Sequence, residues 1–176
     1  MENEYGGAWI ETFSGIKFHF LNPQPSEIRI EDIAHSLALT CRFGGQCREF
    51  YSVAEHSIRV AEIVPNEWKL LGLLHDASEG YMPDIPRPMK AELPDFINIE
   101  LGILKAIWDK FIGEGWRNAK SIIKEADNIL LATEARDLMA NMDDWAELPL
   151  PLADIIVPMS SKGAEQLFLQ RFKELI

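Results

Sequence analysis

The sequence predicts an all-α fold, a bundle of about six helices with a small N-terminal β-hairpin. From Ile28 onward, apolar residues recur at three- and four-residue intervals, which is the periodicity of amphipathic helices. The alternation typical of a half-buried strand is confined to Ile16–Phe20 and ends at a turn, Asn22-Pro23. No Ser/Gly-rich linker, repeat or low-complexity tract divides the 176 residues, so we expect one domain.

Breaker residues set the expected helix boundaries. Helices are predicted near residues 30–39, 49–63, 66–80, 95–112, 119–141 and 161–175. The breaks are Gly44-Gly45, Pro65-Asn66, the proline-rich Pro83–Pro88, Gly113 with Gly115, and Pro149–Pro158.

The composition narrows the classes of partner. Seventeen Lys and Arg oppose 28 Asp and Glu, a formal charge of -11, so the field of the chain repels long nucleic acids and anionic membranes. The longest strongly apolar stretch, Leu70–Leu74, is far too short to span a membrane, and the N-terminus lacks the basic segment of a signal peptide. We therefore expect a soluble cytoplasmic protein in which Cys41 and Cys47 are reduced thiols.

Four ionisable residues lie on or beside the apolar faces of the predicted helices. His56 lies on the apolar stripe of the second helix, and His75 lies on that of the third, with Asp76 beside it. In the fifth helix, Asp127 interrupts a stripe of Ile123, Leu130 and Leu131. A carboxylate placed in this way needs a partner.

Each of these residues alone could be an ordinary hydrogen-bonded core residue, but the set favours a metal site. Burying two imidazoles and two carboxylates separately is costly, whereas one divalent cation neutralises both carboxylates and accepts both imidazole nitrogens. Two nitrogen and two oxygen ligands suit Zn, Co, Mn, Fe or Mg and do not select among them. Four protein ligands also leave positions for water and substrate.

The segments around these residues resemble a known family. Three of them are similar to the H…HD…D signature of the HD-domain metal-dependent phosphohydrolases: Val53–Ser57, Leu73–Glu79 and Glu125–Asp127. The chain most resembles the small subgroup of 5′-deoxynucleotidases and phage-type dATP triphosphohydrolases, over about Ile28 to Leu138. The resemblance implies one HD-type domain, residues 1–176, with a core over about 28–141.

The resemblance also implies roles for individual residues. The metal would be bound by His56, His75, Asp76 and Asp127, the same four residues chosen from the helical stripes. Glu79 and Asp84 would handle the proton of the attacking water or of the leaving group. Arg42 and Lys90 would hold phosphate oxygens, with Arg87 as a further candidate, and Phe43 would pack against the sugar and disfavour a 2′-hydroxyl.

Each role has a structural alternative. Glu79 could be a surface carboxylate, Asp84 a turn former, Arg42 and Lys90 solvated cations, and Phe43 a core residue. His35 is rejected as a ligand because it precedes the HD pair by 40 residues rather than by the 19 that separate His56 from His75.

The reaction that the resemblance implies is hydrolysis of a dNTP to a deoxynucleoside and triphosphate, with dATP as the preferred substrate. The alternatives are a 5′-deoxynucleotidase that releases phosphate from a dNMP, a hydrolase of cyclic nucleotides or guanosine alarmones, and a catalytically idle HD fold that serves as a binding module. We also expect a homo-oligomer, a dimer or larger, in the cytoplasm (that of the host if the protein is phage-encoded).

Overall fold

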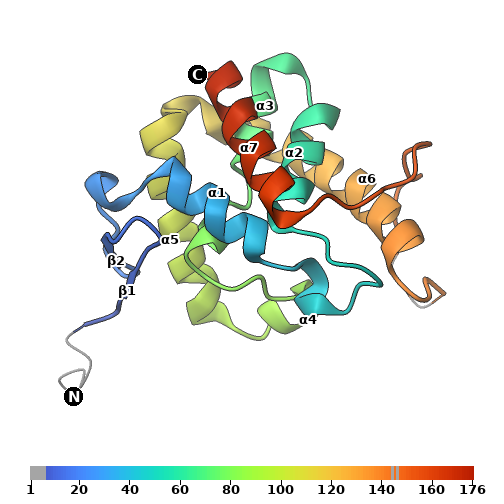
Figure 1. Ribbon diagram of the computed structural model, residues 1–176, viewed down its shortest axis with the longest axis horizontal. Helices are drawn as coiled ribbons and strands as arrows, with labels where there is room; N and C mark the ends of the chain where they lie inside the picture. The colour runs from blue at the N-terminus through green and yellow to red at the C-terminus, as the bar shows by residue number, and fades with distance from the viewer. Residues whose placement is uncertain (1–6, 144, 146) are drawn as a thin grey trace.

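The computed structural model describes residues 7–143, 145 and 147–176, and this part of the chain is mostly helical (Figure 1). Its α-helices are α1 (Ile30–Leu39), α2 (Val53–Ile63), α3 (Lys69–Leu73), α4 (Arg87–Lys90), α5 (Pro94–Phe111), α6 (Lys120–Leu138) and α7 (Ser161–Leu175). Short 3₁₀ segments connect them: η1 (Pro25–Glu27), η2 (Arg42–Gly45), η3 (Asn66–Trp68), η4 (Ala77–Gly80) and η5 (Glu114–Ala119). The prediction of a mainly helical chain with a small hairpin is confirmed.

The hairpin consists of β1 (Trp9–Glu11) and β2 (Lys17–His19), paired antiparallel with Ile10 opposite Phe18. Phe18 is fully buried and its ring stacks on that of Tyr81, with 3.8 Å between centroids. The apolar side of the hairpin therefore packs onto the bundle, as the alternation in β2 predicts.

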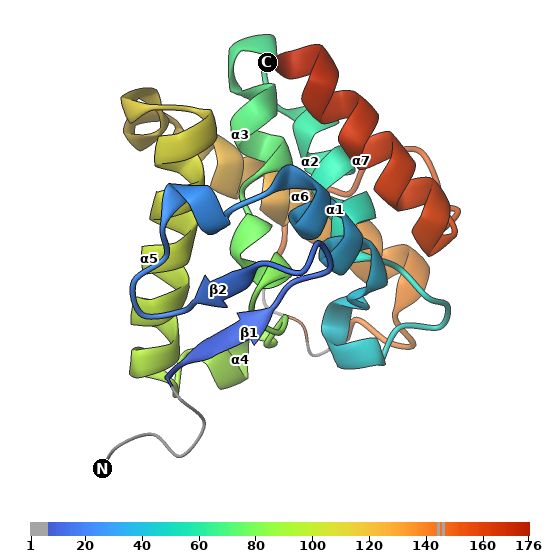
Figure 2. The ribbon, with the colours of Figure 1, turned by 60° about the vertical axis from the view of Figure 1, so that its left-hand side comes forward.

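Helix α2 occupies the centre of the bundle and contacts α1, α3, α6 and α7. In Figures 1 and 2, α1 and α7 lie side by side over one face of α2, while α6 lies on its other side. One apolar cluster joins the hairpin to α1, α5 and α7, and a second joins α2 to α3, η5 and α6. In the described ranges, no helix has both the length and the apolar character needed to cross a bilayer.

Two predicted helix boundaries are wrong. The helix near 49–63 begins only at Val53, because the preceding residues are extended and bonded across the loop: Arg42 N donates to Tyr51 O, and Val53 N donates to Thr40 O. Ser52 then caps α2 by accepting from Glu55 N. The helix near 119–141 ends at Leu138, where the next residue adopts an extended conformation.

The single helix predicted near 66–80 does not form. It is divided into η3, α3 and η4, with Leu74, His75 and Asp76 outside the helical segments. Side chains donate hydrogen bonds to two carbonyls at this break: Gly72 O accepts from His75 Nδ1, and Leu74 O accepts from Trp108 Nε1. Tertiary contacts thus replace the next turn of the helix.

A helix also forms where only a break is predicted. The short α4 begins at the end of the proline-rich run and continues to Lys90, with Pro88 in its first turn. Proline is compatible with this position because the first turn leaves its backbone donors free.

Two glycines allow the broken segment to lie deep in the bundle. A Cβ on Gly72 would lie 3.1 Å from the Cα of Ala61 in α2, and a Cβ on Gly80 would lie 3.1 Å from the Cα of Ile33 in α1. Because glycine lacks this atom, the segment between them fits closely against both helices.

Candidate metal centre

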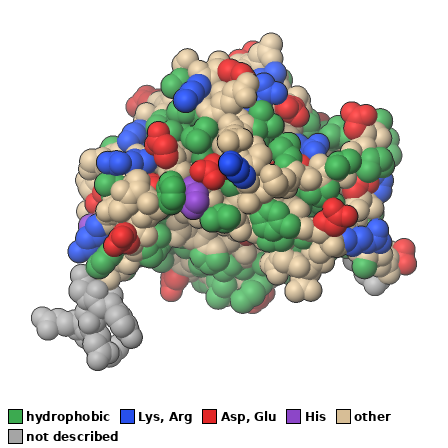
Figure 3. Space-filling view, viewed as in Figure 1, with side chains coloured by type: hydrophobic (Ala, Val, Ile, Leu, Met, Phe, Trp, Pro, Cys, Tyr) green, Lys and Arg blue, Asp and Glu red, His purple; other side chains and the backbone are tan. Residues whose placement is uncertain are grey.

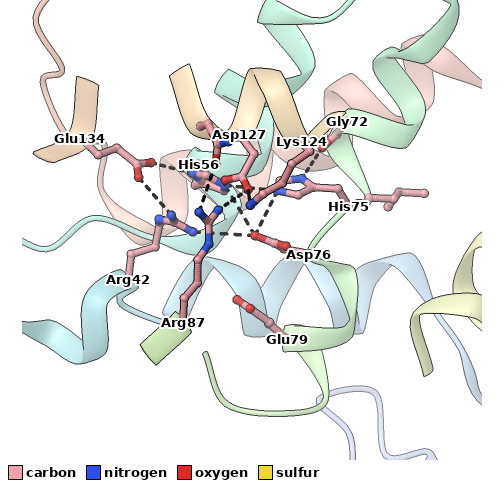
Figure 4. A network of polar contacts seen from close by, with 12 residues as sticks. Arg42, His56, Gly72, His75, Asp76, Glu79, Arg87, Lys124, Asp127 and Glu134 are labelled. Carbon is pink, nitrogen blue, oxygen red and sulfur yellow. Dashed lines mark hydrogen bonds and ion pairs between the residues drawn. The ribbon is translucent and has the colours of Figure 1, made fainter. Parts of the chain in front are cut away.

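Three parts of the fold bring the predicted ligands together (Figure 4). His56 projects from α2, His75 and Asp76 lie at the break after α3, and Asp127 projects from α6. Both histidines are buried, and Asp76 is half-buried. The ligand atoms of His56, His75 and Asp76 all lie within 4.8 Å of one another, so these three side chains could hold a metal ion.

The two imidazoles face each other through their Nε2 atoms, which are 3.3 Å apart. The opposite nitrogen of each ring bonds to a protein acceptor: His56 Nδ1 lies 2.6 Å from Glu134 Oε1, and His75 Nδ1 lies 2.7 Å from Gly72 O. A carbonyl or carboxylate oxygen at Nδ1 favours the tautomer whose Nε2 carries a lone pair. The outer contacts therefore direct both potential ligand atoms toward the same point.

Asp76 adds a carboxylate at that point. Its Oδ2 lies 3.1 Å from His75 Nε2 and 3.6 Å from His56 Nε2. Although burial disfavours the imidazolium, the attraction of Asp76 raises the pKa of His75 to about 9 in the metal-free protein. Burial also opposes ionisation of Asp76, but His75 holds the pKa of this carboxyl well below its usual range.

Asp127, the fourth predicted ligand, lies at the edge of this group. Its Oδ1 is 3.5 Å from His56 Nε2, while its Oδ2 accepts from Arg87 at 2.5 Å and from Lys124 at 3.2 Å. The structure thus places Asp127 beside the cluster and pairs it with two cations.

Glu134 belongs to the same network but is absent from the set predicted from sequence. It is fully buried on α6, accepts from His56 through Oε1, and accepts from Arg42 Nη2 through Oε2 at 3.1 Å. Its position seven residues after Asp127 continues the stripe of Leu130 and Leu131. Extending that stripe by one turn would have found it.

Arg42 reaches the cluster from η2. Its side chain is buried, and Nη1 lies 3.8 Å from Asp76 Oδ2. Burial disfavours the charge, but Glu134 and Asp76 raise the pKa of Arg42 further above its ordinary value. The solvated alternative for Arg42 is therefore wrong, because its counter-charges lie in the interior.

Glu79 and Lys90 lie on the other side of Asp76. Glu79 is buried on η4. It accepts a hydrogen bond from Lys90 Nζ at 3.4 Å, and Lys90 Nζ also donates to Glu100, at the shorter distance of 2.8 Å. Burial, reinforced by Asp76 and Asp84, raises the pKa of Glu79 well above its usual range. The surface alternative for Glu79 is wrong, although Glu79 reaches the site from a 3₁₀ turn and not from the α-helical face predicted for it.

Asp84 is half-buried, and burial raises the pKa of its carboxyl. Arg42 lowers this pKa and Asp76 raises it, and both residues belong to the cluster. Asp84 therefore lies close enough to the site to share its electrostatics.

Phe43 follows Arg42 with a backbone φ of 56°, a left-handed conformation that is uncommon for a bulky residue. Its ring lies 5.2 Å from the Arg42 guanidinium and packs edge-on against Trp145, with 6.2 Å between centroids. Phe43 is only partly buried, so the alternative of a core phenylalanine is wrong.

His35 takes no part in the cluster. It stacks on Phe13 with 3.8 Å between ring centroids, and its Nδ1 lies 3.3 Å from Glu165 Oε2. These contacts agree with its rejection as a metal ligand.

The fold and the site define a mostly helical protein with a His-His-Asp cluster that could hold a metal ion, in which both histidines are buried. The chain belongs to the same family as YfdR of Escherichia coli (strain K12), with 38% identity over 175 residues that cover 96% of each protein. It is also 35% identical over 143 residues to a protein of Rhodobacter capsulatus, covering 74% of this chain and 73% of the relative. Both relatives are named only as uncharacterized proteins, and no protein-family model matches the chain.

Proposed function

We propose that the chain is a metal-dependent phosphohydrolase of the HD-domain type that acts on deoxynucleotides. The observation that carries the proposal is the convergence of two Nε2 atoms, 3.3 Å apart, beside the Asp76 carboxylate. When both rings are neutral and their Nδ1 atoms donate outward, two imidazole lone pairs and a carboxylate share one small volume. Such a concentration of acceptors is stabilised by a cation.

The donor set fits a divalent ion. His56, His75 and Asp76 would hold it, with Asp127 as the fourth candidate, and these nitrogen and oxygen donors suit Zn, Co, Mn, Fe or Mg. When bound, the ion supplies a water of lowered pKa and a positive charge for a phosphoryl oxygen.

Cations around the cluster support an anionic substrate. Arg42 Nε is buried and has no hydrogen-bond partner among the described residues, which leaves a donor for a substrate oxygen. Arg87 is half exposed on α4, and Lys90 lies on the same helix, so both can contribute charge from one side of the site. Arginine and lysine at these positions would bind phosphate oxygens and neutralise their charge.

Glu79 is suited to proton transfer. Burial raises the pKa of Glu79, which favours the protonated carboxyl, and its Oε2 is buried with no hydrogen-bond partner in the described part of the chain. Figure 4 shows its carboxyl group on the side of Asp76 and Arg87. A protonated carboxyl can donate its proton to a leaving oxygen, and Asp84, whose charge helps to raise the pKa of Glu79, is the second candidate for this role.

The reaction we favour releases triphosphate from a dNTP, with dATP as the preferred substrate. Phe43, next to Arg42 at the edge of the cluster, would contact the sugar and disfavour a 2′-hydroxyl. The alternative reaction on the same groups is removal of the 5′-phosphate from a dNMP.

The test is a substrate panel. Chelator-treated protein is reloaded with Mn²⁺ or Co²⁺ and incubated with each dNTP, dNMP and the matching ribonucleotides, and the phosphate products are separated. We expect triphosphate from dATP, little turnover of ATP, and loss of activity in His75→Ala but not in His35→Ala. Orthophosphate from a dNMP alone would replace the first reaction with the second. Absence of both metal retention and turnover would leave the idle binding module.

A further inference from the structure

Glu134 connects two parts of the candidate site that come from different elements. Its two oxygens have different partners: Oε1 lies 2.6 Å from His56 Nδ1 on α2, and Oε2 lies 3.1 Å from Arg42 Nη2 on η2. The side chains of Glu134 and His56 are fully buried and that of Arg42 is nearly so. Water therefore has little access to these hydrogen bonds.

The His56 contact determines which ring nitrogen faces the cluster. An acceptor at Nδ1 holds the proton there, fixes the orientation of the ring, and leaves the Nε2 lone pair facing His75 and Asp76. A charged acceptor does this more strongly than a neutral one and also increases the basicity of the ligand nitrogen.

The Arg42 contact fixes a cation beside the same cluster. Arg42 begins the segment that contains Phe43 and two glycines with positive φ, so its backbone alone does not immobilise the side chain. Glu134 supplies the shortest polar contact of the guanidinium, and Asp76 lies farther away, at 3.8 Å. One carboxylate therefore orients both a candidate metal ligand and a candidate phosphate ligand.

We propose that Glu134 is a positioning residue that sets the metal affinity of the centre through His56 and holds Arg42 toward the substrate. This inference rests on the proposed function, because it assumes that His56 binds a metal. It assigns a role to a residue that lies outside the HD signature.

Glu55 provides a matched control. It is also fully buried, lies next to His56 on α2, and bonds to an arginine, Arg59, at 2.8 Å. Its other oxygen accepts from Met159 N at 2.7 Å, so both of its partners lie outside the cluster. A general effect of neutralising a buried glutamate should appear in both variants, whereas a positioning effect should appear only at Glu134.

The experiment measures Mn²⁺ binding by calorimetry for wild type, Glu134→Gln and Glu55→Gln, with thermal unfolding of each metal-free protein. Glutamine offers one amide oxygen to two donors, so it cannot serve His56 and Arg42 in the same way. We expect Glu134→Gln to bind Mn²⁺ at least about tenfold more weakly. We expect Glu55→Gln to bind like wild type despite a comparable loss of thermal stability.

A second measurement needs no variant. In the Zn²⁺-loaded wild type, long-range ¹H–¹⁵N NMR should show the His56 proton on Nδ1. Wild-type Mn²⁺ affinity in folded Glu134→Gln would overturn the positioning role and leave the proposed function intact. A proton on His56 Nε2 would remove His56 as a ligand through that atom, and would therefore overturn the positioning role together with the proposed metal centre. Failure of the wild type itself to bind Mn²⁺ and Zn²⁺ would overturn both.

Discussion

At the scale of single residues, His75 makes two polar contacts that favour its charged form in the metal-free protein. Its Nδ1 donates to the Gly72 carbonyl, and its Nε2 lies 3.1 Å from the Asp76 carboxylate. Together they outweigh burial and raise the pKa of His75 to about 9. A metal at Nε2 requires the neutral ring, so metal and proton compete for the same nitrogen.

This competition predicts the pH dependence of stability. Because the pKa is raised above its ordinary value of 6.5, the proton on His75 stabilises the metal-free fold fully below that value, and this contribution is lost as the pH rises through 9. The free energy of unfolding of chelator-treated protein should fall between pH 7 and 9.5, by at most about 1.4 kcal/mol per pH unit for this proton. Urea denaturation at a series of pH values measures it.

The metal-loaded protein is the control for that series. Its ligand imidazole is already neutral, so the decline should be absent or much smaller. An equal decline in the two forms would contradict the assignment of the effect to His75.

The sequence predicts most of the candidate metal ligands but not the residues that hydrogen-bond to them. His56, His75 and Asp76 meet as expected, but for two different reasons. His56 points inward from the apolar stripe of α2, whereas His75 and Asp76 reach the centre from the break after α3 and not from a helical stripe. Glu134 is absent from the predicted set because it lies outside the HD signature, and its place on the stripe after Leu130 and Leu131 is its signal in the sequence. The pairing of Asp127 with Arg87 joins side chains 40 residues apart, and no local pattern encodes it.

At the scale of elements, the segment from Gly72 to Gly80 depends on close backbone packing. The missing Cβ of Gly72 would lie 3.1 Å from both Ala61 Cα and Val64 Cγ2, and 3.3 Å from Ala61 N. The Gly72 carbonyl also accepts the hydrogen bond from His75 Nδ1. A shift of α3 away from α2 would therefore move a candidate ligand.

Gly72→Ala is predicted to destabilise the fold by about 1–3 kcal/mol, because the added methyl group overpacks the contact with α2. It should also weaken Mn²⁺ binding, since the acceptor of His75 is displaced. Chemical denaturation and metal titration of the same preparation measure both effects.

Gly102→Ala is the matched control. Gly102 lies in α5, and a Cβ there meets nothing within 4 Å. Alanine should stabilise the helix by up to about 1 kcal/mol and leave metal binding unchanged. Equal effects of the two substitutions would contradict the packing explanation.

A helix boundary can be predicted from the sequence when local residues end the helix, but not when hydrogen bonds to distant residues end it. α1, α5 and α7 agree with the periodicity to within about a residue, because their ends coincide with prolines, capping residues or changes of pattern. The broken segment near 66–80 has a helical pattern, but two of its carbonyls accept hydrogen bonds from side chains. Gly72 O accepts from His75, and Leu74 O accepts from Trp108 of α5. Only the tertiary structure supplies that second partner.

At the scale of the whole molecule, the acidity of the chain is unevenly distributed. Residues 125–154 contain eight acidic side chains and only one arginine. Two of those acids, Asp127 and Glu134, belong to the candidate site, where cations face both of them. At the site, these cations therefore offset part of the negative charge of the segment.

The face of the molecule in Figure 3 carries both signs of charge and scattered apolar groups. Leu150, Ile155 and Val157, on the segment that joins α6 to α7, are all well exposed. We propose that the protein is a homo-oligomer in solution, as its resemblance to the HD subgroup implies. Light scattering should give a multiple of 20.0 kDa, and a mass of 20.0 kDa across the accessible concentrations would refute the proposal.

The break between α3 and η4 has a consequence for how the molecule fluctuates. The carbonyls of Gly72 and Leu74 accept from the side chains of His75 and Trp108, and Leu74 O also accepts from Ala77 N. A few separate hydrogen bonds, and not a continuous helical ladder, thus hold this stretch, so we expect it to open locally before the helices do. A ligand bound by His75 and Asp76 would close this weak point. The residues proposed to perform the chemistry would then also hold the break in its folded conformation. Binding of a ligand at the centre and ordering of the segment between α3 and η4 would therefore be coupled.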